Sequence, residues 1–404
     1  MLFALETLFL RIYMVIFKFV TMIMPFKWPR SFDGPGSSLE LCRHIAAEGH
    51  RKVLIVTDAM LVKLGLLDKM KAELDKVGVA YVIYDGVLPD PTVEQIEAGF
   101  EILKKNDCKA ILAIGGGSSI DAAKVIGARA KNNKPIVKMA GLFRVYWGML
   151  PLYVVPTTAG TGSEVTIAAV VSDRAQKRKL PLMDLKLMPT ACALDGALMT
   201  GLPPHITSAT GMDALTHAVE AFISRNAMKR TDEKAIEATK LIFKYLPTAV
   251  SEGSNVEARQ QMARASNLAG IAFTQAGVGY VHAIAHNFGA RYHTPHGLAN
   301  AIVMPHVLDY SKPTCAARLA ELARACGIGS AGAGDDALAD AFIARIRELK
   351  AQFGIPEQLE ALRADDIAPI AVAARAEARF TYAVPRYMDQ STCEGVIRKM
   401  LVQA

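Results

Sequence analysis

The run Lys109-Ala-Ile-Leu-Ala-Ile114 leads directly into Gly115-Gly-Gly-Ser-Ser-Ile-Asp121-Ala-Ala-Lys124, and this junction decides the fold of the first half of the chain. A short apolar run predicts a buried strand, and the segment after the glycines predicts a helix. Glycine lets backbone amides approach a pyrophosphate closely, and the N–H groups at a helix start bind an anion. The junction therefore predicts a nucleotide-binding loop, with candidate cofactor-binding residues Gly115, Gly116, Gly117, Ser118 and Asp121.

A second junction repeats this pattern. Leu152-Tyr-Val-Val-Pro156 leads into Thr157-Thr-Ala-Gly-Thr-Gly-Ser-Glu164, which is again rich in glycine and threonine. Ser118 lies three residues before Asp121, which is the spacing of a capping box, and Thr161 repeats it, so each predicts a helix start. Two such junctions favour nucleotide binding over a pair of ordinary turns. Neither ends in the Gly-Lys-Ser/Thr of a Walker A loop, which argues against kinase or ATPase chemistry.

Strands and helices alternate around these junctions. Apolar runs at Lys52–Thr57 and Ala80–Tyr84 predict strands, and amphipathic stretches at Leu61–Val77 and Thr92–Asn106 predict helices. This rhythm is typical of βαβ units and a parallel sheet. Asp58 directly follows the first of these strands. Two alternatives stay open for it: a hydrogen bond to a ribose hydroxyl, which would favour NAD over NADP, or an ordinary helix cap.

The composition changes after Gly201-Leu-Pro-Pro204. Ala, Leu, Glu and Lys dominate the second half, and stretches such as Asp232–Leu246 and Val256–Ala272 predict helices. We place a domain boundary near residue 202. The expected fold is α/β followed by all-α, with a Rossmann-like parallel-sheet nucleotide domain at residues 27–201 and a helical domain at residues 202–404.

Five of the nine histidines cluster in one stretch of the second half. His282 and His286 are four residues apart, so on a helix both rings leave the same face. Upstream, Asp213 and His217 have the same spacing. Three imidazoles and one carboxylate suit a borderline divalent ion such as Fe2+, Zn2+, Mn2+ or Co2+. A lone histidine is more often a helix cap or a hydrogen-bonded core residue, but several converging ligands favour a catalytic metal site in the helical domain.

The composition also indicates which classes of partner the chain binds and in which compartment it lies. The 404-residue chain is 51% hydrophobic and 21% charged, which is a globular balance. Its net charge of +7 comes from scattered Lys and Arg, which argues against a nucleic-acid partner. The six cysteines form no C-x-x-C pair, so we expect reduced thiols in a cytoplasmic protein.

Residues 1–26 form an apolar, amphipathic extension. They are mostly Leu, Phe, Ile, Val and Met, with a thin polar stripe that recurs every three or four residues: Thr7, Arg11, Met14, Lys18 and Thr21. Charges inside the run argue against a plain membrane span, and their position argues against a secretory signal. Three alternatives stay open: a helix lying in a membrane surface, a helix buried against a subunit or domain, or a true start at Met24.

From Trp28 onward the chain resembles the iron-containing (group III, metal-dependent) alcohol dehydrogenase family. The motifs that carry the resemblance are Gly115–Lys124, Pro156–Glu164, Gly211–Glu220, Gly279–His286 and Thr294–Gly297. The family has a Rossmann-like nucleotide domain followed by a helical domain. By matching motif, the resemblance implies that the metal ligands are Asp213, His217, His282 and His296, that His286 relays a proton, and that Asp58, Thr157, Thr158 and Lys179 contact the cofactor together with Gly116, Gly117 and Ser118.

The resemblance implies an NAD-dependent oxidoreductase that transfers a hydride reversibly between a primary alcohol, including medium- and long-chain ones, and its aldehyde. Fe2+ is the expected metal and Zn2+ the alternative. We also expect a homo-oligomer, with peripheral membrane contact through residues 1–26. The alternatives are a related reductase on the same scaffold, such as a maleylacetate-type, lactaldehyde, diol or glycerol enzyme, or a catalytically idle, membrane-associated or filament-forming scaffold.

Overall fold

The computed structural model describes residues 2–402 with the exception of residues 175, 177 and 331. The chain divides into two compact units. The α/β unit comprises Phe26–Leu202 and Gly253–Asn267, and the helical unit comprises Met1–Pro25, Pro203–Glu252 and Leu268–Ala404. The helical unit thus takes in the N-terminal extension, and the α/β unit takes in a short segment of the second half.

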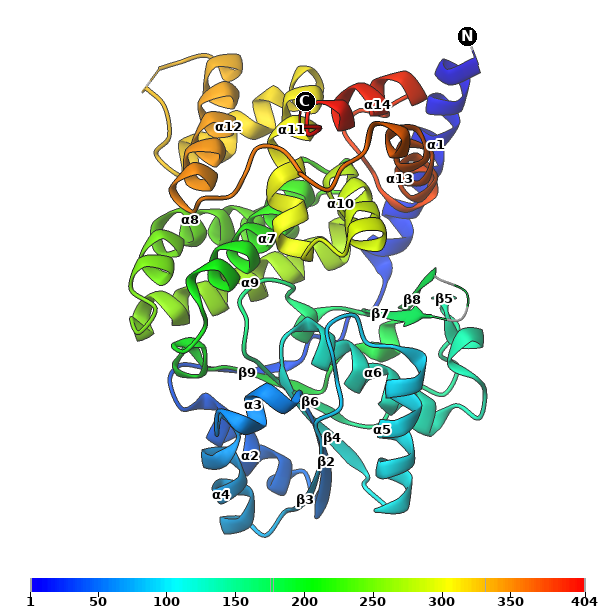
Figure 1. The fold of residues 1–404 in the computed structure, drawn as a ribbon, viewed down its shortest axis with the longest axis vertical. Helices are drawn as coiled ribbons and strands as arrows, with labels where there is room; N and C mark the ends of the chain where they lie inside the picture. The colour runs from blue at the N-terminus through cyan, green and yellow to red at the C-terminus, as the bar shows by residue number, and fades with distance from the viewer. Residues whose placement is uncertain (1, 175, 177, 331, 403–404) are drawn as a thin grey trace. The chain divides into compact units, whose positions relative to one another are not determined.

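A six-stranded parallel sheet forms the centre of the α/β unit, in the order β1-β9-β6-β4-β2-β3 (Figure 1). Helices α2 and α4 cover one face of it, and α5 and α6 cover the other. The strands and helices are β1 (Arg30–Asp33), α2 (Ser37–Ala47), β2 (Lys52–Val56), α3 (Ala59–Lys63), α4 (Asp68–Lys76), β3 (Ala80–Tyr84), α5 (Val93–Lys105), β4 (Ala110–Gly115), α6 (Gly117–Lys131), β6 (Leu152–Pro156) and β9 (Ala191–Leu194).

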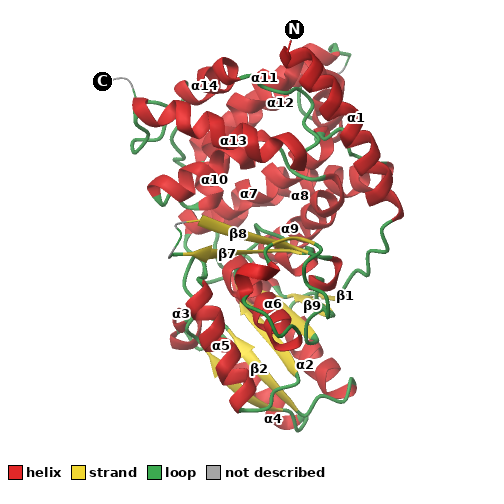
Figure 2. Cartoon of the chain, turned by 90° about the vertical axis from the view of Figure 1, so that its right-hand side faces the viewer, coloured by secondary structure: helices red, strands yellow, loops and turns green. Residues whose placement is uncertain are grey.

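Apolar side chains on both faces explain why this sheet is parallel and buried. In β4, Ile111 and Ala113 pack with the α5 and α6 side chains, whereas Leu112 and Ile114 pack with those of α2 and α4. A strand covered by helices on both faces reads as a continuous apolar run, as β4 does. The α/β unit also has a small three-stranded sheet, in which β7 (Ala168–Asp173) and β8 (Arg178–Met183) form an antiparallel pair (Figure 2) and β5 (Gly141–Leu142) flanks β8.

The helical unit is built around α7 (Pro204–Ile223). Every residue from Gly211 to Ile223 is buried, so the polar side chains on this part of α7 must find partners inside the unit. The other helices are α1 (Leu2–Ile23), α8 (Lys229–Ser251), α10 (Tyr280–Tyr292), α11 (His296–Ala325), α12 (Asp335–Gln352), α13 (Ile367–Thr381) and α14 (Gln390–Arg398), while α9 (Val256–Ala276) begins in the α/β unit and ends in the helical unit.

The predicted fold class is confirmed, because a parallel sheet flanked by helices is joined to a helical region. One predicted helix is wrong: Leu61–Val77 is two helices, α3 and α4, because Gly65 between them adopts a left-handed φ of 69°. Among the described residues, no single helix has the length and apolar composition to cross a membrane, while the pair α9 and α10, bent by 105°, meets that test together.

Candidate metal centre and nucleotide loops

Four side chains of the helical unit converge on one point. Helix α7 supplies Asp213 and His217, α10 supplies His282, and α11 supplies His296; one donor atom from each lies within 4.8 Å of the others. His217 Nε2 lies 3.0 Å from His282 Nε2, and His296 Nε2 lies 3.5 Å from Asp213 Oδ1. The i and i+4 spacing on α7 puts its two donors on one face of that helix. The structure therefore brings together all four residues that the family motifs indicate.

A close approach of two helices delivers His296 to this cluster. Helix α11 begins at His296, and the next residue, Gly297, packs directly on α7. A Cβ atom at Gly297 would lie 2.2 Å from the carbonyl oxygen of Ala209, which is far below any real contact distance. Only glycine permits this approach. The Thr-Pro-His-Gly sequence thus provides both the donor and the space that it needs.

A buried carboxylate contacts the ring nitrogen of His282 that does not face the cluster. Glu220 Oε2 lies 2.6 Å from His282 Nδ1, and Glu220 Oε1 accepts a hydrogen bond from the Val281 backbone N–H at 2.8 Å. Burial raises the pKa of Glu220 to about 7, although the backbone donors act in the opposite direction. Burial and the neighbouring histidines hold the pKa of His282 well below its usual value, so its ring is neutral. The contact favours a proton on Nδ1 and leaves the Nε2 lone pair for the cluster.

Asn300 provides a test of whether the cluster fits a cation. Its side-chain Nδ2 lies 2.7 Å from Asp213 Oδ1 and 3.2 Å from both His282 Nε2 and His296 Nε2. Three acceptor atoms thus converge on one amide donor, as acceptors around a cation would. The Oδ1 atom of Asn300 is buried with no hydrogen-bond partner within the described part of the chain. Three imidazoles and a carboxylate are donors that Fe2+ and Zn2+ accept, so the residues fit a divalent transition metal.

His286 lies beside the cluster and outside it. Its ring centroid is 5.9 Å from that of His282 and 5.3 Å from that of His296. His286 Nδ1 lies 2.7 Å from Glu377 Oε1, which also accepts a hydrogen bond from the Tyr382 hydroxyl at 2.6 Å. The side chain of His286 is 41% exposed. A chain of titratable groups therefore leads from the edge of the cluster towards solvent, which suits proton transfer.

The two nucleotide loops meet in the α/β unit. Strands β4 and β6 are adjacent and parallel, so the loops that follow them share one edge of the sheet, and the Thr157 N–H donates to the Gly115 carbonyl at 3.0 Å. Thr158 lies against Gly116. This is the arrangement in which α/β sheets bind nucleotides, at the carboxyl ends of the strands.

The predicted capping boxes in these loops are wrong. Helix α6 begins at Gly117 with Gly116 as its N-cap, so Ser118 already lies in the first turn. After the second loop the chain forms only a single 3-10 turn at Ser163–Val165 and then enters β7. Asp121 accepts hydrogen bonds from the Ser163 hydroxyl at 2.7 Å and the Val170 N–H at 2.9 Å, so this carboxylate ties α6 to the second loop.

Lys124 makes the same link from the next turn of α6. Its side chain is fully buried, and its ammonium group donates to the Thr166 hydroxyl and carbonyl at 2.8 Å each and to the Ala168 carbonyl at 2.9 Å. It also lies 3.3 Å from the Ser163 hydroxyl, which bonds Asp121. Burial lowers the pKa of Lys124 to about 8, against the charges of nearby carboxylates. Asp121 and Lys124, three residues apart on α6, therefore tie the helix that follows the first nucleotide loop to the second loop.

The remaining candidate cofactor residues have partners of their own. Asp58 Oδ1 accepts hydrogen bonds from the Met60 and Leu61 N–H groups at 3.0 Å each, so this carboxylate caps α3 at the end of β2. Lys179 on β8 lies 2.7 Å from Asp90 Oδ1 and donates to the Ser172 hydroxyl at 2.9 Å. Both side chains would have to share these contacts with a bound cofactor.

Sequence reasoning missed three residues that contact the metal cluster or His286. Glu220 lies seven residues after Asp213 and Asn300 lies four after His296, so helical spacing could have placed both on the ligand faces. Glu377 comes from α13, far along the chain, and carries no such signal.

The comparisons with known proteins agree with this geometry. Residues 29–196 match the family model described as iron-containing alcohol dehydrogenase, and residues 207–401 match that of the C-terminal region of the same family. The chain is 40% identical to the NAD-dependent methanol dehydrogenase of Bacillus methanolicus over 81% of this chain and 86% of that protein, and 36% identical to the lactaldehyde reductase of Escherichia coli K12 over 84% and 90%. A solved 1,3-propanediol oxidoreductase superposes with a TM-score of 0.90 at 36% identity, covering 93% of this chain and 100% of that one. The chain therefore belongs to the iron-containing alcohol dehydrogenase family.

Proposed function

We propose that this chain is a metal-dependent, NAD-linked alcohol dehydrogenase that interconverts a primary alcohol and its aldehyde. The observation that carries this proposal is the convergence of four side chains on one point of the helical unit: the buried Asp213, His217 and His282 and the more exposed His296. The similarity to an NAD-dependent methanol dehydrogenase supports the choice of cofactor and reaction.

The four converging residues would hold the metal, with Fe2+ as the first expectation and Zn2+ as the alternative. When bound, the cation supplies Lewis-acid stabilisation of negative charge on a substrate oxygen, and NAD supplies the hydride acceptor. Glu220 keeps the proton of His282 on Nδ1, so that Nε2 remains a donor to the cation. His286 receives the hydroxyl proton at Nε2 while Glu377 orients its ring through Nδ1.

The α/β unit would bind NAD at the edge where the two loops meet. The N–H groups at the start of α6, at Gly117 and Ser118, bind the pyrophosphate, with Gly115 and Gly116 leaving space for it. Thr157 and Thr158 contact the cofactor from the second loop. Asp58 lies at the end of β2, where an acidic side chain accepts a hydrogen bond from a ribose hydroxyl of the cofactor. Lys179 provides a further contact to the cofactor.

A second candidate is a reductase of small diols or hydroxyaldehydes on the same scaffold. It is favoured by the similarity to the lactaldehyde reductase and to the 1,3-propanediol oxidoreductase. Both candidates use the same metal cluster and loops, so the length and polarity of the substrate distinguish them.

The setting of the enzyme is part of the same proposal. We propose a cytoplasmic homo-oligomer with peripheral membrane contact through residues 1–26. All six cysteines are free, five of them buried, which supports a reducing compartment. The exposed apolar side chains of α1 support contact with another surface.

A substrate series tests the proposed activity. Purified protein is stripped of metal, reloaded with Fe2+ or Zn2+, and assayed with NAD by absorbance of the reduced nicotinamide, using ethanol through dodecanol and 1,3-propanediol. The proposal expects activity on primary alcohols that disappears with the metal and returns on reloading. Equal activity with and without metal, or none with any alcohol or aldehyde after reloading, would refute it.

A further inference from the structure

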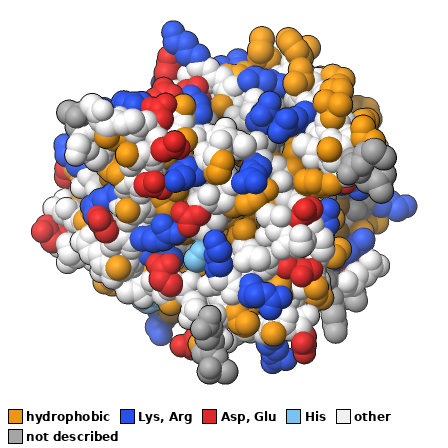
Figure 3. Space-filling model, turned by 90° about the horizontal axis from the view of Figure 1, so that it is seen from above, with side chains coloured by type: hydrophobic (Ala, Val, Ile, Leu, Met, Phe, Trp, Pro, Cys, Tyr) orange, Lys and Arg blue, Asp and Glu red, His pale blue; other side chains and the backbone are white. Residues whose placement is uncertain are grey.

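Helix α1 presents a continuous apolar face to solvent. Large apolar side chains recur along it at helical spacing, and seven of them are between 55% and 81% exposed: Leu5, Leu8, Phe9, Ile12, Ile16, Phe19 and Ile23. Figure 3 shows a band of hydrophobic side chains along the margin of the helical unit where α1 lies. An exposed patch of this kind on a folded protein marks an interaction surface.

The opposite face of α1 is fixed to the helical unit. Leu10 and Met14 are only 2% and 3% exposed. The ammonium group of Lys18 donates to the backbone carbonyls of Arg225 and Ala227, at 3.1 and 2.6 Å. The inward face of this helix is therefore mixed, with Leu10, Met14 and Lys18 turned to the protein, while many large apolar side chains face outward, unlike on an ordinary surface helix.

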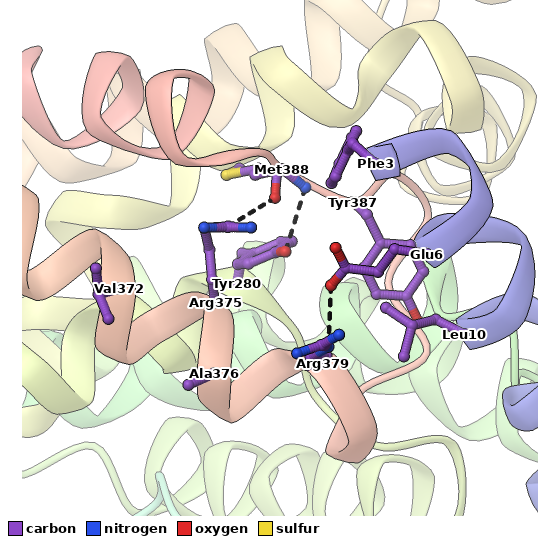
Figure 4. Close-up of a pocket in the computed structure, with 10 residues that line it drawn as sticks. All are labelled: Phe3, Glu6, Leu10, Tyr280, Val372, Arg375, Ala376, Arg379, Tyr387 and Met388. Atoms are coloured by element: carbon purple, nitrogen blue, oxygen red, sulfur yellow. Dashed lines mark hydrogen bonds and ion pairs between the residues drawn. The ribbon is translucent and has the colours of Figure 1, made fainter. Parts of the chain in front are cut away.

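The first half of α1 is held by charge and packing. Glu6 points towards Arg379 on α13, with the two side chains 2.9 Å apart (Figure 4). Both side chains line a cavity of about 180 Å³ whose walls also include Leu10, Tyr280 and Tyr387. Tyr13 also meets Phe380 of α13 edge to face. Because both halves of α1 are seated, the helix offers its apolar face as a rigid surface rather than as a tether.

Cations gather along one edge of the apolar face. Lys18 bonds the carbonyl of Arg225, and the Arg230 guanidinium lies 3.5 Å from a carbonyl oxygen near the end of α1, so this segment of the chain borders the helix. Arg11 lies seven residues, or about two helical turns, before Lys18, so both side chains leave the same side of α1. Arg11, Arg225 and Arg230 are exposed.

Two carboxylates near this edge are each paired with another arginine. Glu6 bonds Arg379, and Asp232 bonds Arg318. An apolar face with a basic edge complements a bilayer in which acyl chains lie below anionic headgroups.

The size of the face favours a lipid surface over a second copy of the chain. A helix of 22 residues is about 33 Å long and roughly 10 Å wide, so its outer face covers only a few hundred Å². A stable protein interface buries about 800 Å² on each partner. A bilayer has no such threshold, since each apolar side chain that enters it adds to binding independently.

We propose that the outward face of α1 docks on a bilayer that contains anionic phospholipid, with the helix axis parallel to the membrane plane and Arg11 and Arg225 at the headgroups. This inference rests on the peripheral membrane contact proposed above and adds the face, the orientation and the class of lipid.

Sedimentation of the full chain with vesicles tests the inference. Wild-type protein should sediment with phosphatidylcholine vesicles that contain phosphatidylglycerol, and a triple variant, Ile12→Ser with Ile16→Ser and Phe19→Ser, should lose at least tenfold in partitioning. The matched control is Leu64→Ser, which changes a 63% exposed leucine of the α/β unit and should sediment as wild type. Arg11→Gln with Arg225→Gln should remove the preference for anionic over neutral vesicles. Wild-type protein that stays in the supernatant, or a triple variant that sediments equally well, would overturn the inference.

Two further measurements keep the outcomes separate. An environment-sensitive fluorophore on Ile16→Cys should shift to the blue when anionic vesicles are added, whereas one on Leu64→Cys should not; an unshifted Ile16 probe contradicts the docking. Light scattering reports whether the triple variant dissociates an oligomer. If it does so while sedimentation with vesicles is unaffected, α1 is an assembly helix and the proposed docking on lipid is refuted. Activity on a water-soluble alcohol is followed in parallel, so failure of the proposed reaction is distinguished from failure of docking.

Discussion

Glu220 Oε2 lies 2.6 Å from His282 Nδ1, and the two side chains are only 4% and 3% exposed. The carboxylate is itself held by the Val281 N–H at the start of α10, the helix that carries His282. A residue of α7 therefore sets both the tautomer and the orientation of a donor on α10. Such carboxylate–histidine contacts tune metal affinity without touching the metal.

The variant Glu220→Gln keeps the shape of this side chain and removes its charge. Because a glutamine can donate to Nδ1 and favour the wrong tautomer of His282, we expect metal affinity to fall by about 10- to 100-fold. The affinity is measured by titrating the metal-free protein with Co2+ and following the visible absorption of the bound ion. Glu377→Gln serves as the control, since Glu377 contacts His286 and not a proposed ligand. Unchanged Co2+ affinity in Glu220→Gln would show that the contact is only structural.

Replacing His286 should separate proton transfer from metal binding. We expect His286→Ala to keep its metal and to lose roughly 100- to 10,000-fold in turnover, as is usual for a lost acid–base group. Because Glu377 only orients the His286 ring, Glu377→Gln should lose less activity than His286→Ala. The loss should fall on kcat rather than on KM, and the pH profile of kcat should change. Metal analysis of both variants decides the assignment: loss of metal from His286→Ala would make it a ligand.

Lys124→Met tests the link between the two nucleotide loops. The change leaves the Thr166 and Ala168 carbonyls without this buried donor, which costs about 1–3 kcal/mol of stability, so the α/β unit should unfold at lower denaturant concentration. NAD affinity, measured by calorimetry, should fall as the second loop loses its anchor, while metal content stays unchanged because the cluster belongs to the helical unit. Lys131→Met, an exposed change at the end of the same helix, is the control. Equal NAD affinity in the two variants would contradict the linking role.

Gly297→Ala tests the close approach of α11 to α7. The added Cβ would meet the Ala209 carbonyl oxygen, and overpacking of this kind costs about 1–3 kcal/mol. The shift of α11 should also move His296 and weaken metal binding. Gly395→Ala on α14 is the matched control: its Cβ meets nothing within 4 Å, and it should stabilise by about 0.5–1 kcal/mol. In denaturant unfolding, we expect the midpoint of Gly297→Ala to fall below that of wild type and the midpoint of Gly395→Ala to rise above it. Equal midpoints in the two variants would contradict the close approach.

The elements that were predictable from sequence are those with a strong local pattern. β2, β3 and β4 are short apolar runs, and the helix predicted at Thr92–Asn106 is α5 with Thr92 as its cap. Strand β1 was missed because its sequence, Arg-Ser-Phe-Asp, is short and mostly polar, and its pairing with β9 joins residues far apart in the chain. Such long-range pairing leaves no periodic signal.

The same distinction applies to the candidate sites. Spacing could place Asp213 with His217, and His282 with His286, on one helix face each. The family motifs indicated His296 in place of His286, and the structure brings His296 into the cluster with the other three. The roles of Asp121 and Lys124 could not be foreseen, because both reach a loop some 40 residues further on, with sequence separations of 42 for the Asp121–Ser163 and Lys124–Thr166 contacts. Which of several nearby polar residues meets a side chain depends on tertiary packing, which a single sequence does not encode locally.

The most direct test of the metal-centre assignment is the metal content of His282→Ala, measured together with its NAD affinity and its turnover. The account predicts that this variant loses tight metal binding and alcohol oxidation together and still binds NAD, because the substitution removes one of four donors in the helical unit and leaves the loops of the α/β unit intact. His205→Ala, an exposed histidine in the first turn of α7, should match wild type in all three measurements. Near-normal turnover with a full complement of metal in His282→Ala would contradict the assignment of the metal centre.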